Sequence, residues 1–183
     1  MDVIPTPIPE VLLLKPRVFG DARGFFSESF NQRVFDAAVG GHTTFVQDNH
    51  SRSSYGVLRG LHYQIRQPQG KLVRVARGQA FDVAVDLRRS SPTFGQWAGA
   101  LLTDAGAEQL WVPPGFAHGF LALSETVDFL YKTTDYYAPE HERSIAWNDP
   151  TLAIQWPALT VAAPTISAKD AQACAFADAA YFD

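Results

Sequence analysis

The chain has 183 residues, of which 46% are apolar and 13% aromatic, and its formal net charge is −4. This length and composition predict one folded domain over residues 1–183 with a full core, and exclude a disordered chain. The acidic balance argues against a general nucleic-acid binder, which is usually basic, but it leaves room for a small anionic ligand held by a few cationic side chains.

The elements expected along the chain are two helices and a series of short strands. Ser29 is placed to cap a first helix over residues 31–39, which the pair Gly40-Gly41 ends. Twelve prolines and thirteen glycines divide the apolar runs that follow into short segments typical of strands. We expect strands at residues 59–64, 71–77, 79–87, 96–102, 109–112, 119–123 and 127–133.

The clearest strand pattern lies at residues 79–87, where apolar side chains alternate with acidic or small ones. One face carries Phe81, Val83, Val85 and Leu87, and the other carries Asp82, Ala84 and Asp86. Many short strands at this spacing predict a sandwich or barrel of antiparallel strands. A second helix is predicted from residue 168 to about residue 179, because Ser167 and the residues after it fit a capping box.

The single cysteine, Cys174, cannot form an internal disulfide and is typical of a reducing compartment, so we expect a cytoplasmic protein. The first residues have neither the basic start nor the apolar stretch of a signal peptide. No run of 18 apolar residues occurs, and we therefore expect no membrane span.

Two fragments carry side chains suited to proton transfer. Arg59-Gly60-Leu61-His62-Tyr63-Gln64 puts a histidine in a strand broken by glycine, and Phe129-Leu130-Tyr131-Lys132 puts a tyrosine in an aromatic strand. A histidine titrates near pH 7 and suits a general base, whereas a tyrosine phenol is a possible acid. The competing interpretations are a structural histidine and a core aromatic, and the sequence alone does not make the two side chains face each other.

A metal site is not expected, although short strands of this kind are typical of metal-binding cupins. His62 stands alone where such sites have a pair of histidines, and His118 follows the turn Pro113-Pro114-Gly115. Two histidines fall short of the three or four protein donors that a transition metal needs, which disfavours a metal-dependent oxygenase. The candidate contacts for an anion, each also interpretable as a solvated surface charge, are Arg23, Arg59, Lys71 and Lys169.

Many segments of the chain match one family in the same order. They include Arg59-Gly60-Leu61-His62-Tyr63-Gln64 and Gly115-Phe116-Ala117-His118-Gly119-Phe120. The full set is residues 18–26, 28–31, 45–51, 56–64, 69–74, 81–86, 91–95, 111–113, 115–120, 142–145 and 147–150. On these segments the sequence closely resembles the dTDP-4-dehydrorhamnose 3,5-epimerases over nearly its whole length.

The resemblance implies a mainly β protein, a cupin-type jelly-roll barrel of antiparallel strands with a few short helices, that acts as a homodimer without metal or cofactor. The implied substrate is dTDP-4-dehydro-6-deoxy-D-glucose, which is inverted at C3 and C5 to give dTDP-4-dehydro-L-rhamnose in dTDP-L-rhamnose biosynthesis. Both carbons flank the C4 ketone, so their protons are acidified by enolate resonance. No nucleic-acid or membrane partner is implied.

The resemblance also implies roles for individual residues. His62 matches the family's base and Tyr131 its acid on the opposite face. Asp170 matches the carboxylate that orients the base, although it also fits the third position of the helix capped by Ser167. Lys71 matches the contact to the C4 oxygen, where enolate charge develops. The positions that contact the ligand in the family are matched by Gln47, Asp48, Asn49, Arg59, His118, Tyr137, Glu142 and Lys169. Arg23 and Glu28 match positions on a segment that, in the family, reaches into the partner's pocket.

Other functions stay open at this stage. In the same fold, an epimerase acting only at C3 or only at C5 needs similar residues, and the choice depends on how the sugar ring moves. The presence of both His62 and Tyr131 disfavours a 3,4-ketoisomerase. A non-catalytic nucleotide-sugar binding module would keep Arg59 and Lys71 but would not need His62, Tyr131 and Asp170.

Overall fold

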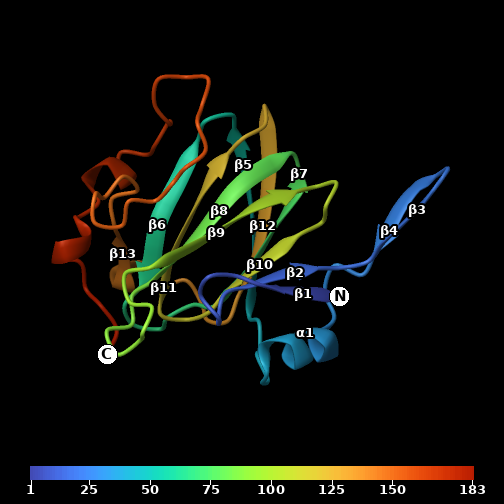
Figure 1. Ribbon diagram of the computed structural model, residues 1–183, viewed down its shortest axis with the longest axis horizontal. Helices are drawn as coiled ribbons and strands as arrows, with labels where there is room; N and C mark the ends of the chain where they lie inside the picture. Colours follow the sequence, from blue (N-terminus) through green and yellow to red (C-terminus); the bar gives the residue numbers. More distant parts are fainter.

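Two antiparallel β-sheets that pack face to face form the body of the protein (Figure 1). The computed structural model describes all of residues 1–183. The first sheet consists of β1 (Asp2–Pro5), β2 (Leu12–Lys15), β5 (Gln47–Ser54), β7 (Lys71–Arg77), β10 (Gln109–Val112) and β12 (Thr126–Thr133). Its strands lie in the order β1-β2-β10-β7-β12-β5.

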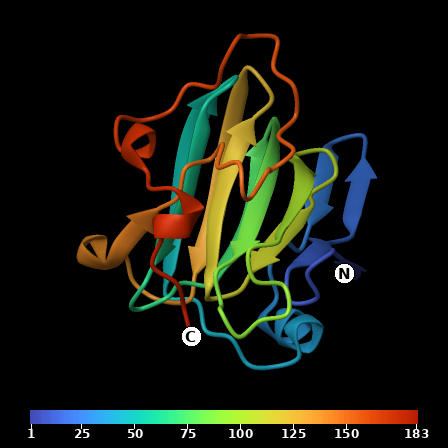
Figure 2. The same cartoon turned by 60° about the vertical axis from the view of Figure 1, so that its left-hand side comes forward.

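The second sheet consists of β6 (Leu58–Gln64), β8 (Gln79–Asp86), β9 (Trp97–Thr103), β11 (Phe116–Ala122) and β13 (Glu142–Ser144). Its order is β13-β6-β11-β8-β9, and every pairing of named strands in both sheets is antiparallel. The predicted class, a mainly β protein of antiparallel strands, is therefore confirmed. A separate hairpin, β3 (Val18–Asp21) with β4 (Gly24–Ser27), projects from this body (Figures 1 and 2).

Helices are few and short. They are α1 (Gln32–Val39) and the 3-10 turns η1 (Pro139–His141), η2 (Asp170–Gln172) and η3 (Phe176–Asp178). None of them has the length and apolar character needed to cross a membrane.

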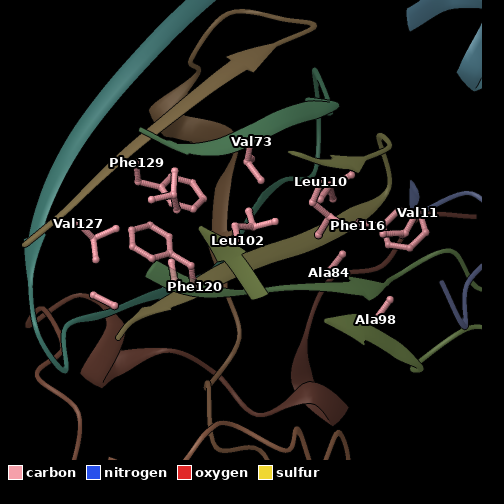
Figure 3. Packing of buried hydrophobic residues seen from close by; sticks show 14 of the residues in the cluster. Val11, Val73, Ala84, Ala98, Leu102, Leu110, Phe116, Phe120, Val127 and Phe129 are labelled. Carbon is pink, nitrogen blue, oxygen red and sulfur yellow. The ribbon is translucent and has the colours of Figure 1, made fainter. Parts of the chain in front are cut away.

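The main core fills the space between the two sheets (Figure 3). Phe120 of β11 and Phe129 of β12 stack with ring centroids 4.0 Å apart and an interplanar angle of 6°, so one pair of side chains joins the sheets. Val73 and Leu110 continue the cluster from the first sheet, and Ala84 continues it from the second. Apolar burial of this kind is the dominant favourable term in folding.

Strand β8 is buried on both faces, and its predicted alternation is confirmed. Ala80 and Ala84 pack in the core between the sheets, whereas Val83 and Val85 pack in a second cluster on the outer side. Segments of residues 145–182 supply the other half of that second cluster and cover the outer face (Figure 2). The acidic residues of β8 consequently point inward, towards the space between the sheets.

Helix α1 covers part of the outer face of the first sheet. Its buried Phe35 packs edge-on against Trp111, with ring centroids 5.2 Å apart. The predicted helix and its end at Gly40, which has φ +75°, are confirmed, but the cap is Asn31 instead of Ser29. The Asn31 side chain accepts a hydrogen bond from the backbone N–H of Val34.

The predicted strands are all present, two of them with the expected bounds and the others displaced at their ends by one to three residues. Strand β5 was missed because every residue in it is polar, from Gln47 to Ser54. Its inner face borders a polar cavity, so its side chains do not show the apolar alternation that marks a strand. The short strands β1, β2, β3, β4 and β13 were missed as well.

The prediction of a second helix through residue 179 is wrong. Ser167 does cap the segment, since its Oγ accepts a hydrogen bond from the backbone N–H of Asp170 at 3.0 Å, but only a 3-10 turn follows. Cys174 then runs extended beside Ile145, and its backbone N–H and C=O bond to Ser144 and Ala146. Hydrogen bonds to the sheet edge thus replace the helical ones.

Candidate active site

A cavity of about 480 Å³ opens between the two sheets, and side chains from both of them line it. His62 and His118 come from β6 and β11 of the second sheet, and Lys71 and Tyr131 come from β7 and β12 of the first. The lining also contains Ser51, Val57, Leu58, Arg59, Tyr63, Gln64, Gln69, Phe120, Phe129, Tyr137, Glu142, Thr165, Ile166, Ser167, Lys169 and Asp170. His62 and Tyr131 therefore lie on facing walls of one cavity.

An irregularity at Gly60 lets Arg59 and His62 share this cavity. Residues three apart on a regular strand point to opposite faces. The register of β6 against β11 shifts between His118, which pairs with His62, and Phe120, which pairs with Arg59. Gly60 has φ +125°, a backbone conformation that residues with a side chain rarely adopt. Arg59 then reaches across to the first sheet, where its Nε donates to Ser53 Oγ at 3.0 Å.

His62 is bonded to a buried carboxylate. Its Nε2 lies 2.5 Å from Oδ1 of Asp170, which the start of η2 holds in place. Burial by itself raises the pKa of Asp170, but the hydrogen bond and the charge of His62 outweigh it, and the pKa lies below its usual value. An ionised Asp170 fixes the proton of the imidazole on Nε2 and leaves Nδ1 free to accept one.

Lys71 and Tyr131 form the opposite wall, and both are buried enough for their pKa values to move. Burial lowers the pKa of Lys71 to about 8, against the opposing charges of Asp82 and Glu142. Burial also raises the pKa of Tyr131, with a further contribution from Glu142. At neutral pH the wall consequently presents a cationic amine beside a phenol that keeps its proton.

Hydrogen bonds link the polar side chains of one cavity wall. Glu142 lies 2.5 Å from Lys169 and accepts a hydrogen bond from the Tyr137 hydroxyl at 2.8 Å. The backbone N–H of Tyr137 donates to Gln47, which in turn donates to Asn49 Oδ1 at 2.9 Å. The network joins β13 and the nearby segment before η1 to β5 and to Lys169, which are both far from them in the sequence.

Together these groups are equipped to move a proton on an anionic ligand. A histidine with one nitrogen free faces a protonated tyrosine across the cavity, and cationic side chains of Arg59, Lys71 and Lys169 line it. No group of three or more His, Cys, Asp or Glu side chains is arranged to hold a metal ion.

A family model described as dTDP-4-dehydrorhamnose 3,5-epimerase matches residues 5–178. The chain belongs to this family. This epimerase is 65% identical over 175 residues to the dTDP-4-dehydrorhamnose 3,5-epimerase of Pseudomonas aeruginosa, with 96% of each chain covered. It is therefore a sugar-nucleotide epimerase, an enzyme of the isomerase class.

Two solved structures place this epimerase among its neighbours. The 3,5-epimerase of Legionella pneumophila, in complex with dTDP-4-keto-L-rhamnose, is 53% identical with a TM-score of 0.92, and the match covers 95% of this chain and 92% of that one. A 3′-monoepimerase of Streptomyces bikiniensis, in complex with dTDP-quinovose, is 33% identical with a TM-score of 0.87, and the match covers 94% of this chain and 87% of that one.

Most of the residues predicted for the site of this epimerase do meet at the cavity. Five do not line it within their own chain: Arg23, Glu28, Gln47, Asp48 and Asn49. Arg23 and Glu28 belong to the hairpin and to the residue just after it, where Arg23 bonds only to Asp21. Asp48 points to the outer face of β5 and pairs with Lys132 at 2.9 Å.

Sequence reasoning missed several residues of the cavity. Ser51 was overlooked because β5 was not expected to be a strand, and the alternation of this strand turns Ser51 inward. Gln64 follows His62 by two positions on β6, and its side chain holds the loop at Tyr136 and Ala138. The period of two from His62 was a usable signal for Gln64. Asp82, which bonds to His118 from behind the cavity wall, was seen only as part of a strand pattern.

Proposed function

We propose that this epimerase inverts both C3 and C5 of dTDP-4-dehydro-6-deoxy-D-glucose, giving dTDP-4-dehydro-L-rhamnose for dTDP-L-rhamnose biosynthesis. The observation that carries the proposal is the position of His62 and Tyr131 on facing walls of one cavity. An epimerase needs a base on one face of a carbon and an acid on the other. The names of the relatives support the choice of a dTDP-linked sugar.

In the proposed reaction His62 Nδ1 removes the proton from a carbon next to the C4 ketone. The electron pair of the broken C–H bond moves into the ketone and forms an enolate. The Lys71 ammonium stabilises the charge on the C4 oxygen, where a fixed cation in a dry site acts most strongly. Asp170 stabilises the imidazolium.

Tyr131 then donates its proton to the opposite face of the same carbon, and the enolate returns to the ketone with inverted configuration. After the step His62 is protonated and Tyr131 is a phenolate, so both exchange protons with water before the next turnover. The raised pKa of Tyr131 keeps the phenol protonated between turnovers. The same cycle at the second carbon completes the reaction.

The remaining contacts hold the nucleotide diphosphate. Arg59 is suited to it because a planar guanidinium binds phosphate oxygens with two hydrogen bonds. Lys169 adds a further donor, His118 contacts the ligand from β11, and Tyr137 packs on the ligand beside Glu142. Gln47 and Asn49 offer amide groups from β5. We propose that Arg23 and Glu28 complete the pocket of a partner subunit in a homodimer, with Asp48 near that interface.

Deuterium uptake tests the function directly. The enzyme is incubated in heavy water with dTDP-4-dehydro-6-deoxy-D-glucose, and NMR and mass spectrometry identify the labelled carbons. We expect label at both C3 and C5 and a product that a 4-ketoreductase converts to dTDP-L-rhamnose. Label at one carbon would make the enzyme a single-site epimerase, as the Streptomyces bikiniensis relative is named. No label at all would mean binding without proton transfer.

A further inference from the structure

The cavity contains a second histidine–aspartate pair. His118 Nε2 lies 2.8 Å from Oδ1 of Asp82, a contact that is wholly buried. His118 and His62 are directly opposite each other on the neighbouring strands β11 and β6. Each histidine therefore gives Nε2 to a carboxylate and leaves Nδ1 without a hydrogen bond.

Asp82 lies behind the cavity wall and does not line it, and its side chain has no exposed surface. Its second oxygen, Oδ2, is buried without a hydrogen-bond partner. An unpaired buried carboxylate oxygen is costly unless nearby positive charge compensates it. No packing requirement explains an acid here, since the other inward positions of β8 near it are alanines, Ala80 and Ala84.

Besides His118, Lys71 is the cationic side chain whose charge acts on Asp82. It occupies the inward side of β7, in alternation with Val73 and Val75 of the core, just as Asp82 alternates with the core alanines of β8. Lys71 forms no ion pair within 4 Å, and the one hydrogen bond of its Nζ goes to the carbonyl of His62, at 3.4 Å. The titratable groups around it are His62 of β6, Asp82 of β8, His118 of β11, Tyr131 of β12 and Glu142 of β13.

We propose that Asp82 is a positioning residue of this site, whose single buried carboxylate fixes the proton of His118 on Nε2 and stabilises the buried ammonium of Lys71. The roles of His118 and Lys71 towards the ligand rest on the proposed function. The position of the proton on His118 and the charge of Lys71 do not depend on it. A neutral His118 then presents Nδ1 to the cavity as an acceptor. Lys71 stays charged at neutral pH although burial opposes its charge, and the charge of Asp82 raises the pKa of Lys71.

The first experiment compares Asp82→Asn with Asp86→Asn. Asp86 is an equally buried, inward-facing acid of the same strand, but it bonds Arg88, Ser91 and Thr93 away from the cavity. The rate of deuterium uptake from heavy water is measured against pH. We expect Asp82→Asn to move the high-pH decline down by about one unit, the shift typical of losing one nearby opposite charge. Asp86→Asn should lower the melting temperature and leave the pH profile unchanged.

The second experiment needs no turnover, and it separates this inference from the proposed function. In ligand-free enzyme, nitrogen NMR of the imidazoles should show His118 protonated on Nε2, and carbon NMR should show Lys71 titrating near pH 8 in the wild type. Asp82→Asn should lower that midpoint by about one unit. An unchanged midpoint, or a wild-type His118 protonated on Nδ1, would overturn the role of Asp82 even if the enzyme is an epimerase. An inactive wild type with both signals present would overturn only the reaction.

Discussion

Two histidines of the cavity each form a hydrogen bond from Nε2 to a buried carboxylate. The opposite wall carries the amine of Lys71 and the phenol of Tyr131. The pairing decides which nitrogen of His62 faces a ligand, because Asp170 occupies the other one. A histidine without such a partner exchanges its two tautomers freely. We therefore expect the site to depend on its carboxylates as much as on the groups that would touch substrate.

Replacing Tyr131 with phenylalanine should separate proton exchange from inversion. The ring keeps its place beside Phe129, but the proton donor is lost. We expect deuterium uptake at one or both carbons to continue while the rate of completed inversion falls by about 10²-fold or more. Tyr136→Phe is the matched control, since that tyrosine is exposed and lies outside the cavity lining. Uptake and inversion that fall in step would contradict a separate acid role for Tyr131.

Lys71 should make activity and stability change in opposite directions above neutral pH. Its pKa in the folded enzyme is about 8, against 10.5 for an ordinary lysine, so it loses its proton as pH rises through 8 and turnover should decline. Between pH 8 and about 10 the unfolded chain binds more protons than the folded one, so the free energy of unfolding should rise from this residue.

Urea denaturation of the wild type and of Lys71→Met at pH 7.5 and 9.5 measures the stability effect. The free energy of unfolding should be higher at pH 9.5 than at pH 7.5 in the wild type, and this increase should be absent from the variant. Lys71→Arg is the companion for activity, because a guanidinium stays protonated throughout this range and should remove the decline. A wild-type pH profile that is flat up to pH 10 would contradict the lowered pKa.

At the scale of elements, the close approach of β6 and β11 positions the residues of the cavity. A Cβ on Gly119 would lie 2.7 Å from the carbonyl oxygen of Arg59, and one on Gly60 would lie 2.6 Å from Cα of Gly119. Both distances are shorter than real Cβ contacts, and the obstructing atoms are backbone. The two glycines are therefore required for the strand irregularity that turns Arg59 into the cavity.

Gly119→Ala should destabilise the enzyme by about 1–3 kcal/mol, the usual cost of forcing an extra methyl group into a packed site. Activity per folded molecule should fall as well, because the strands that carry His62 and His118 must separate. Thermal denaturation and kcat are the measurements. Gly41→Ala is the matched control, since a Cβ there meets nothing within 4 Å and should change neither quantity. A stable and active Gly119→Ala enzyme would show that the strands can adjust.

At the scale of the whole molecule, the β3–β4 hairpin points to a second subunit. It stands away from the two sheets, with Phe25 and Phe26 70% or more exposed and Phe19 more than half exposed (Figures 1 and 2). Large exposed apolar side chains gathered in one place are typical of a surface that another chain covers. Arg23, at the tip of this hairpin, would reach the cavity of a partner in a homodimer.

Mixing two inactive variants tests this arrangement. Arg23→Glu damages the hairpin and His62→Ala damages the cavity, so a mixed dimer would contain one intact site made from two chains. Random mixing should restore about a quarter of wild-type activity, because half of the dimers are mixed and half of their sites are intact. The control mixes His62→Ala with Tyr131→Phe, whose defects lie in the cavities of both chains. Recovery no greater than in this control would contradict a shared site.

The sequence by itself determined seven of the thirteen strands, the first helix and nine of the twenty residues that line the cavity. Alternation along β8 was visible because its outward face carries Val83 and Val85 whereas its inward face carries alanines and acids. The family resemblance was carried by continuous segments such as residues 56–64. These features are local, and side chains close in the chain express them without help from distant residues.

Only the tertiary structure decided how distant segments meet. It brought His62 and Tyr131 to facing walls, turned Arg59 inward at Gly60 and left Arg23 on a projecting hairpin. It also replaced the expected C-terminal helix, since hydrogen bonds to Ser144 and Ala146 hold Cys174 extended. The helix propensity of a few residues does not decide their structure in such places. Contacts between segments far apart in the chain contribute more free energy than that propensity does.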